Sequence, residues 1–81
     1  MAERKRYPRL RTLKTGKIVF DRRNCVIDCT VRNLSAAGAC LELPSTVGVP
    51  ERFDLLIGPE KHARPCRVAW KDETQVGVTF Q

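Results

Sequence analysis

Apolar and polar residues alternate along most of the chain, from Gly16 to its end. A period of two is the pattern of β-strands that bury one face, whereas amphipathic helices repeat every 3.6 residues. Turn-forming residues divide the alternating region into six short segments. Their predicted inward positions, in chain order, are Ile18 and Phe20; Cys25, Ile27, Cys29 and Val31; Ala37, Ala39, Leu41 and Leu43; Phe53, Leu55 and Ile57; Cys66, Val68 and Trp70; and Val76, Val78 and Phe80. Six strands without a helical segment predict an all-β fold, a barrel or sandwich, and we favour a small six-stranded antiparallel β-barrel because closure removes exposed edges.

The first residues of the chain, 1–14, lack this alternation. Pro8 removes a backbone donor and restricts Tyr7 to extended conformations. We therefore divide the chain into a flexible N-terminal arm, residues 1–14, and a barrel domain, residues 15–81. A chain of 81 residues forms one small domain with a modest core.

Positive charge is concentrated at the N-terminal end. Residues 1–23 carry nine basic and two acidic side chains, a net charge of +7, whereas residues 24–81 carry six basic and seven acidic side chains, a net charge of −1. The excess in the arm and the first strand predicts an anionic partner, which is a nucleic acid, an acidic surface or a small phosphate ligand. A solubilising tail is the alternative interpretation.

Several classes of function find no support in the sequence. No apolar run is long enough to span a membrane or to act as a signal segment, so we expect a cytoplasmic protein without membrane insertion. The four cysteines form no Cys-x-x-Cys pair, and His62 is the only histidine, which argues against a metal site. Without a nucleophile dyad, an acid/base pair or a phosphate loop, we expect neither an enzyme nor a bound cofactor.

The arm bears four basic side chains close together: Arg4, Lys5, Arg6 and Arg9. An arginine guanidinium binds phosphate through two parallel hydrogen bonds, and it also stacks on a base or donates to guanine O6 and N7. The arm therefore suits a compact ligand that combines phosphates with purines.

A second group of small and polar residues lies in the stretch RNLSAAG, residues 32–38. The Asn33 amide offers a donor and an acceptor to a base edge, and the Ser35 hydroxyl donates to phosphate oxygens. Gly38 allows a backbone to approach a ligand where a Cβ atom would collide. Asn, Ser and Gly are also common turn residues, and Gly38 comes into line with the other two only if the chain bends or bulges between them.

These motifs, in their order and strand context, resemble a PilZ domain. The likeness rests on the basic arm, on NLSAAG leading into ACLEL, on the later strands ending in VGVTF, and on TLKTGKIVF, VIDCTVRNLS and PCRVAW. The likeness covers essentially the whole chain, and the chain is similar to short single-domain members from bacteria. Such domains carry Arg-x-x-x-Arg near the N-terminus and Asp/Asn-x-Ser-x-x-Gly later in the chain. The resemblance implies a six-stranded barrel that binds the second messenger cyclic di-GMP.

The resemblance also implies a role for each matching residue. Arg9, as the second arginine of the arm motif, would contact phosphate and stack on guanine. Asn33 would read a guanine edge, Ser35 would reach a phosphate, and Gly38 would lie close under a base. The arm would fold over the ligand and become ordered.

The arm departs from the family pattern at one position. Lys5 stands where the motif has its first arginine, and lysine lacks the guanidinium fork and its flat stacking face. The loss of one bidentate contact corresponds to about 1–3 kcal/mol of binding free energy, unless Arg4 or Arg6 replaces it.

The predicted function is therefore a signalling receptor or adaptor, in which cyclic di-GMP orders the arm and changes the surface offered to an unidentified partner protein. One alternative is a PilZ-like interaction module that does not bind the nucleotide. A second is a small basic barrel that binds nucleic acid, which is disfavoured because the few aromatic residues lie mostly at core positions. Trp70 is among these predicted core residues, and Tyr7 in the arm is the better candidate for a ligand contact.

Overall fold

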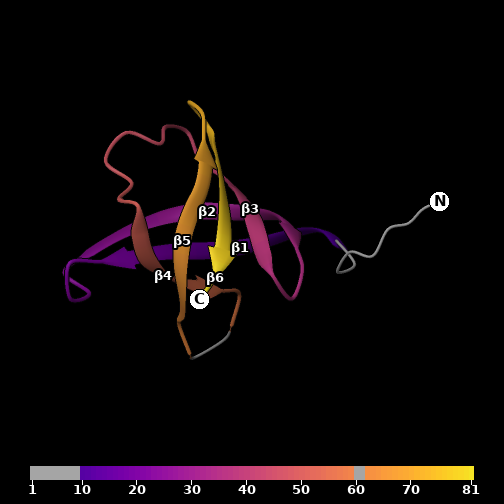
Figure 1. The fold of residues 1–81 in the computed structure, drawn as a ribbon, viewed down its shortest axis with the longest axis horizontal. Coiled ribbons are helices and arrows are strands. Elements are labelled where there is room, and N and C mark those ends of the chain that lie inside the picture. The colour runs from indigo at the N-terminus through magenta and orange to yellow at the C-terminus, as the bar shows by residue number, and fades with distance from the viewer. Residues whose placement is uncertain (1–9, 60–61) are drawn as a thin grey trace.

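The computed structural model describes residues 10–59 and 62–81. Within these ranges six antiparallel strands close into a barrel, and no helix is present (Figure 1). The strands are β1 (Leu10–Phe20), β2 (Cys25–Leu34), β3 (Gly38–Glu42), β4 (Arg52–Ile57), β5 (Arg64–Lys71) and β6 (Gln75–Phe80). Their order around the barrel is β1-β2-β3-β6-β5-β4. The predicted all-β barrel of six strands is confirmed.

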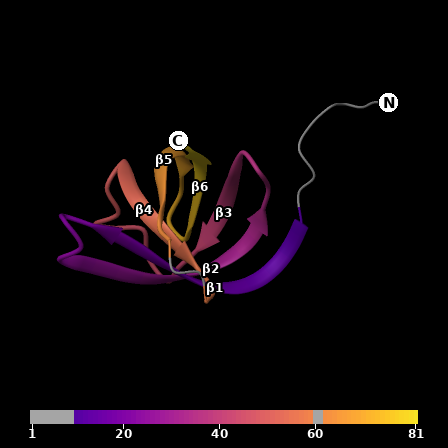
Figure 2. The same cartoon turned by 90° about the horizontal axis from the view of Figure 1, so that it is seen from below.

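The strands β1 and β2 form a hairpin that reaches beyond the rest of the barrel. They pair from Leu10 opposite Leu34 to Phe20 opposite Cys25. By contrast, β1 pairs with β4 only over residues 16–19. Figure 2 shows this hairpin as a curved base, with the other strands rising from it on one side. The first half of β1 therefore projects past β4, alongside the end of β2.

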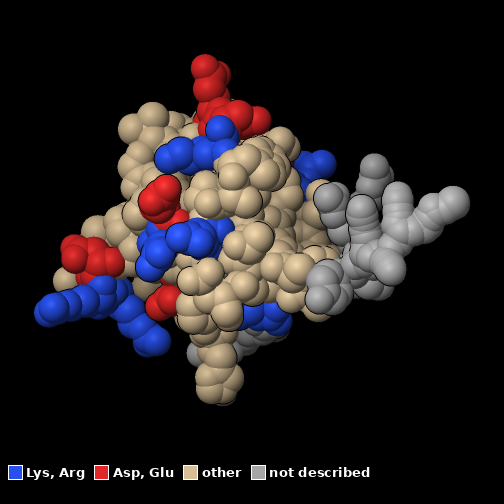
Figure 3. All heavy atoms as spheres, viewed as in Figure 1, with Lys and Arg blue, Asp and Glu red and all other residues tan. Residues whose placement is uncertain are grey.

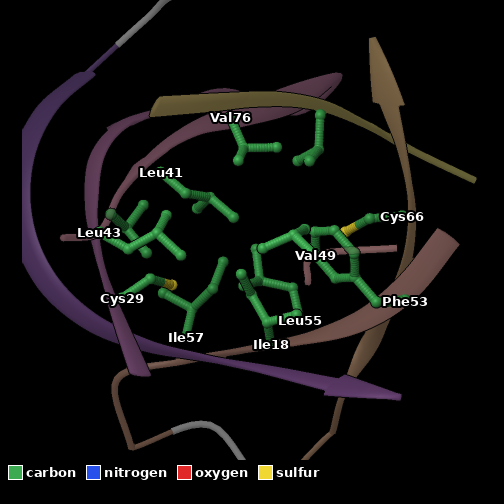
Figure 4. Close-up of a cluster of buried hydrophobic side chains, with 12 residues drawn as sticks. Ile18, Cys29, Leu41, Leu43, Val49, Phe53, Leu55, Ile57, Cys66 and Val76 are labelled. Atoms are coloured by element: carbon green, nitrogen blue, oxygen red, sulfur yellow. The ribbon is translucent and has the colours of Figure 1, made fainter. Parts of the chain in front are cut away.

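The core fills the inside of the barrel with side chains from every strand (Figure 4). Leu41, Leu55 and Val76 are fully buried there, each at a predicted inward position. Burial of such a side chain contributes about 1.5–3 kcal/mol to the free energy of unfolding. The alternation in the sequence thus located the inner face of the barrel.

The first strand begins at Leu10, well before Gly16, where the alternation begins. The reason is a β-bulge, because the register of β1 against β2 shifts between Arg11 and Lys14. A bulge inserts an extra residue and reverses the inward and outward phases that follow it, so a bulged strand shows no simple period of two. Residues 10–14 of the predicted arm are thus part of β1, although the sequence shows the alternation only from Gly16.

The loop between β3 and β4 is fastened to the hairpin of β5 and β6. Thr46 is buried, and its Oγ1 donates a hydrogen bond of 2.5 Å to the carbonyl oxygen of Asp72. Lys71 Nζ donates to the carbonyl oxygen of Val49 at 3.2 Å. These bonds hold the end of β5 in place, immediately beside the candidate site.

Candidate functional site

Two β-bulges turn side chains from the inner to the outer face of the barrel. The register shifts between Val31 and Asn33 in β2, and between Val68 and Trp70 in β5. Asn33 and Trp70 each come two residues after a residue that faces the core, so an uninterrupted alternation of this sequence would point both side chains inward. With the bulges, both side chains lie on the outer face.

Four register partners form a row across this outer face. Asn33 on β2 lies opposite Cys40 on β3, Cys40 lies opposite Gly77 on β6, and Gly77 lies opposite Trp70 on β5. Strands in a sheet are about 4.8 Å apart, so the backbones at the two ends of the row are about 14 Å apart. Residues far apart in the sequence thus face one surface.

The residues after Asn33 form a turn that Ser35 holds together. Ser35 N donates to the carbonyl oxygen of Gly38 at 2.9 Å, which closes the turn. Ser35 Oγ accepts hydrogen bonds from the N–H groups of Ala37 and Gly38, each at 3.2 Å. The hydroxyl proton is left with a long contact of 3.4 Å to the carbonyl oxygen of Gly38. The predicted bend between Asn33 and Gly38 is therefore present.

Gly38 is packed against the backbone of β6. A Cβ atom at this position would collide with the carbonyl oxygen of Val78, which is a rigid backbone group. Gly38 has no positive φ angle. The fold itself thus demands glycine here for close approach of β3 and β6, a requirement that sequence reasoning had assigned to the ligand.

Asn33 differs from Ser35 in having no internal partner. Its side chain is half-buried, and within the described residues it makes no hydrogen bond. Native structures satisfy most buried polar groups, so an amide left open at the edge of a hollow is suited to a ligand. Beside it, the guanidinium of Arg32 pairs with the carboxylate of Glu42 at 2.7 Å.

The row and the turn surround a hollow of about 590 Å³, within the usual range for small-molecule sites. The hollow is lined by Asn33, Leu34, Ser35, Ala37, Gly38, Ala39, Cys40, Ala69, Trp70, Gln75, Gly77, Val78 and Thr79. None of the described residues that line the hollow is charged. In Figure 3, charged side chains lie at the top, on the left and in the middle of the molecule, with others at its lower and right edges, while an area without charge lies over β6 and β3.

The predicted basic residues Arg4, Lys5, Arg6 and Arg9 lie outside the described residues. The backbone nevertheless fixes where their segment joins the barrel, because Leu10 is the register partner of Leu34. Leu34 lines the hollow and precedes the Ser35 turn. The basic segment is thus attached directly beside an uncharged site.

Trp70 is the site residue that sequence reasoning missed. It was predicted to lie in the core, but its side chain is 48% exposed and lines the hollow. The bulge after Val68 is the reason, and strict alternation gives no sign of it. The available signal was the glycine at position 77, whose missing side chain leaves room for a large neighbour on the next strand.

The cysteines do not form a second site. None of the four is in a disulfide. Cys29 and Cys66 are buried, and burial raises the pKa of the Cys29 thiol to about 11 and that of Cys66 to about 12. Among residues 10–59 and 62–81, no group of three or more His, Cys, Asp or Glu side chains is placed to hold a metal ion. The same ranges contain no helix long and apolar enough to cross a membrane.

Comparison with known proteins assigns the chain to a family. The model of the PilZ domain matches residues 3–81. Among solved structures, the crystal structure of the PilZ domain of CeSA from a cellulose synthesizing bacterium is similar, with a TM-score of 0.69, over 91% of this chain and 80% of that chain. The two sequences are 12% identical, so this likeness concerns the fold alone. No curated protein sequence matches. Because the family model spans nearly the whole chain, from the basic arm to the last strand, this protein belongs to the PilZ domain family.

Proposed function

We propose that this PilZ domain binds cyclic di-GMP in the hollow over β2, β3, β6 and β5, and that the ligand orders the basic arm. The ordered arm then changes the surface offered to a partner protein. One observation carries the proposal: two bulges bring Asn33 and Trp70 to the same outer row, beside the Ser35 turn. The family membership supports the choice of ligand.

The chemistry of the row suits a purine. The half-exposed indole of Trp70 offers a flat surface on which a base stacks, and base–aromatic stacking contributes about 1–3 kcal/mol per base. The open amide of Asn33 donates to and accepts from the edge of a guanine. Between them, the small residue Cys40 leaves space for the base.

The phosphates require groups that the hollow lacks. Ser35 Oγ uses its lone pairs within the turn, so its proton is the group that donates to a phosphate oxygen. The uncharged lining cannot neutralise two phosphates, and the arm joins the barrel beside the turn. We therefore assign charge neutralisation to Arg9 and to the Arg4–Arg6 segment, with Lys5 limiting the affinity.

Calorimetric titration of the full chain with cyclic di-GMP tests the proposal, with single-stranded RNA titrated in parallel. We expect binding of the dinucleotide, a loss of about tenfold in affinity for Arg9→Ala and for Asn33→Ala, and a gain for Lys5→Arg. Lys17→Ala is the matched control, because this basic residue lies on β1 and pairs with Asp28 at 2.8 Å, outside the hollow. It should leave the affinity within twofold.

Each other outcome selects a different function. An absence of heat, together with unchanged NMR signals from the arm at millimolar ligand, would leave an interaction module that does not bind the nucleotide. Preferential binding of RNA would identify a nucleic-acid-binding barrel. Weaker binding by Lys5→Arg would show that Lys5 does not occupy the place of the motif arginine.

A further inference from the structure

We propose that Gly77 is a positioning residue of the ligand site, because its missing side chain lets the indole of Trp70 lie across β6 and face the ligand. This inference rests on the proposed binding function. It adds a residue that contacts no ligand itself and acts through the aromatic surface beside it.

The indole of Trp70 lies directly against Gly77. A Cβ atom at position 77 would overlap the indole ring at Nε1 and Cε2 and would approach Cδ1 to 2.7 Å. These are the atoms of the ring itself, not the flexible end of a side chain. Gly77 is buried although it faces outward, because the indole covers it. Any larger residue would therefore displace the ring.

The backbone gives no reason for glycine at this position. Among the described residues, the glycines with positive φ are Gly48 and Gly58, and Gly77 is not one of them. Glycine in the middle of a strand weakens it by roughly 0.5–1 kcal/mol relative to alanine. Its presence in β6 is explained by the space that the indole occupies.

The strand register shows how the space above Gly77 directs the indole of Trp70. Gly77 stands between Trp70 and Cys40, and Cys40 is the partner of Asn33. An indole lying over Gly77 extends from β5 toward the open amide of Asn33 and narrows the gap that a base must bridge. If the indole instead pointed away from β6, the stacking surface and the edge-reading amide would be too far apart to hold one base.

A purely structural role is the rival explanation, since an aromatic side chain that covers a strand glycine stabilises a sheet. A double-mutant cycle separates the two roles. The variants are Gly77→Ala, Trp70→Ala and the double variant. The control is Gly48→Ala, which is strained by a φ of 91° and lies outside the hollow. The measurements are the Kd for cyclic di-GMP, the urea midpoint, and acrylamide quenching of Trp70, the only tryptophan.

We expect Gly77→Ala and Trp70→Ala each to weaken binding roughly 10- to 100-fold, and Gly77→Ala also to alter the quenching of Trp70. In the Trp70→Ala background, the change Gly77→Ala should alter the Kd by less than twofold, because the ring that it displaces is absent. Gly48→Ala should lower the urea midpoint and leave the Kd unchanged.

Three results would overturn the inference. The first is a folded Gly77→Ala protein with wild-type Kd and wild-type quenching, and the second is full additivity of the two changes in Kd. The third applies if Gly77→Ala does not fold, and it is a double variant that also fails to fold, which would show that the strand itself requires glycine. A double variant that folds would support the inference, because removal of the indole then removes the collision. If the wild-type protein does not bind cyclic di-GMP, the proposed function fails, while the quenching data still test whether Gly77 positions the indole.

Discussion

The inner and outer faces of the same strands are built by different rules. Inside, β4 alternates without interruption, and Phe53, Leu55 and Ile57 are all buried. Outside, the surface around the hollow depends on interruptions, because the bulges before Asn33 and Trp70 break the alternation. The core is formed by regularly alternating strands, and the candidate site is formed at the β-bulges.

This difference follows from what each face requires. A core needs apolar volume, which many combinations of aliphatic residues supply. A ligand site needs particular groups at particular positions, and bulges re-aim side chains while leaving the rest of the strand in the barrel. We therefore expect core substitutions to act on stability and substitutions around the hollow to act on binding.

The largest expected effect is on the inner face. Leu55→Ala removes a fully buried side chain, and we expect it to lower the free energy of unfolding by about 3 kcal/mol. The matched control is Leu13→Ala on β1, where the side chain is 76% exposed and the expected change is within about 0.5 kcal/mol. Urea denaturation measures both. Equal losses would mean that the alternation misidentifies the inner face.

Gly38→Ala tests a place where the outer face is packed directly against a neighbouring backbone. The new methyl group meets the backbone of β6 at Val78, so we expect a loss of about 2 kcal/mol from strained strand pairing. Ala36→Gly, in the exposed part of the same turn, is the control and should change stability much less. An unchanged urea midpoint for Gly38→Ala would show that β3 and β6 separate easily.

Two substitutions of Ser35 distinguish its role in stabilising the turn from its proposed role in binding the ligand. Ser35→Ala removes an acceptor of two backbone hydrogen bonds, which should lower stability by about 1 kcal/mol. Ser35→Asp retains an acceptor for these bonds but brings a negative charge to the proposed phosphate position. We expect near wild-type stability and no detectable calorimetric binding of cyclic di-GMP. Retained binding by Ser35→Asp would place the phosphates elsewhere.

The last expected effect appears only at alkaline pH and comes from the buried thiols of the inner face. Burial, reinforced by Asp54, raises the pKa of Cys66 from 9.0 to about 12. The unfolded chain thus releases this proton at lower pH than the folded chain, so its contribution to stability is complete below about pH 8.5 and is lost as the pH rises through 9 toward 12. Urea midpoints between pH 7 and 10.5 should decline above pH 9, and less steeply in Cys66→Val. A midpoint unaffected by pH would contradict the assignment.

The sequence was sufficient for the architecture because alternation is a direct consequence of strand geometry. It identified six strands, most of the positions that face the core, and the bend between Asn33 and Gly38, but it misplaced Ala37 and Trp70, which are exposed. It did not reveal the bulges, since an extra residue such as Ala69 looks like any other small residue in the chain. For the same reason it placed the side chain of Trp70 in the core. It also explained Gly38 by a ligand, where the contact with Val78 already requires glycine.

The bulge in β5 has a consequence for how such a site arises. Substitution of Ala69 leaves the number of residues in β5 unchanged, and Trp70 then stays on the outer face. Deletion of Ala69 removes the bulge, and the tryptophan then follows the inward-facing Val68 directly and keeps its outward place opposite Gly77. Acrylamide quenching of the tryptophan should therefore stay close to that of the wild-type protein. The bulge hides the outer position of this side chain from the sequence pattern, and a barrel of this kind without the extra residue presents the same stacking surface with an ordinary alternation.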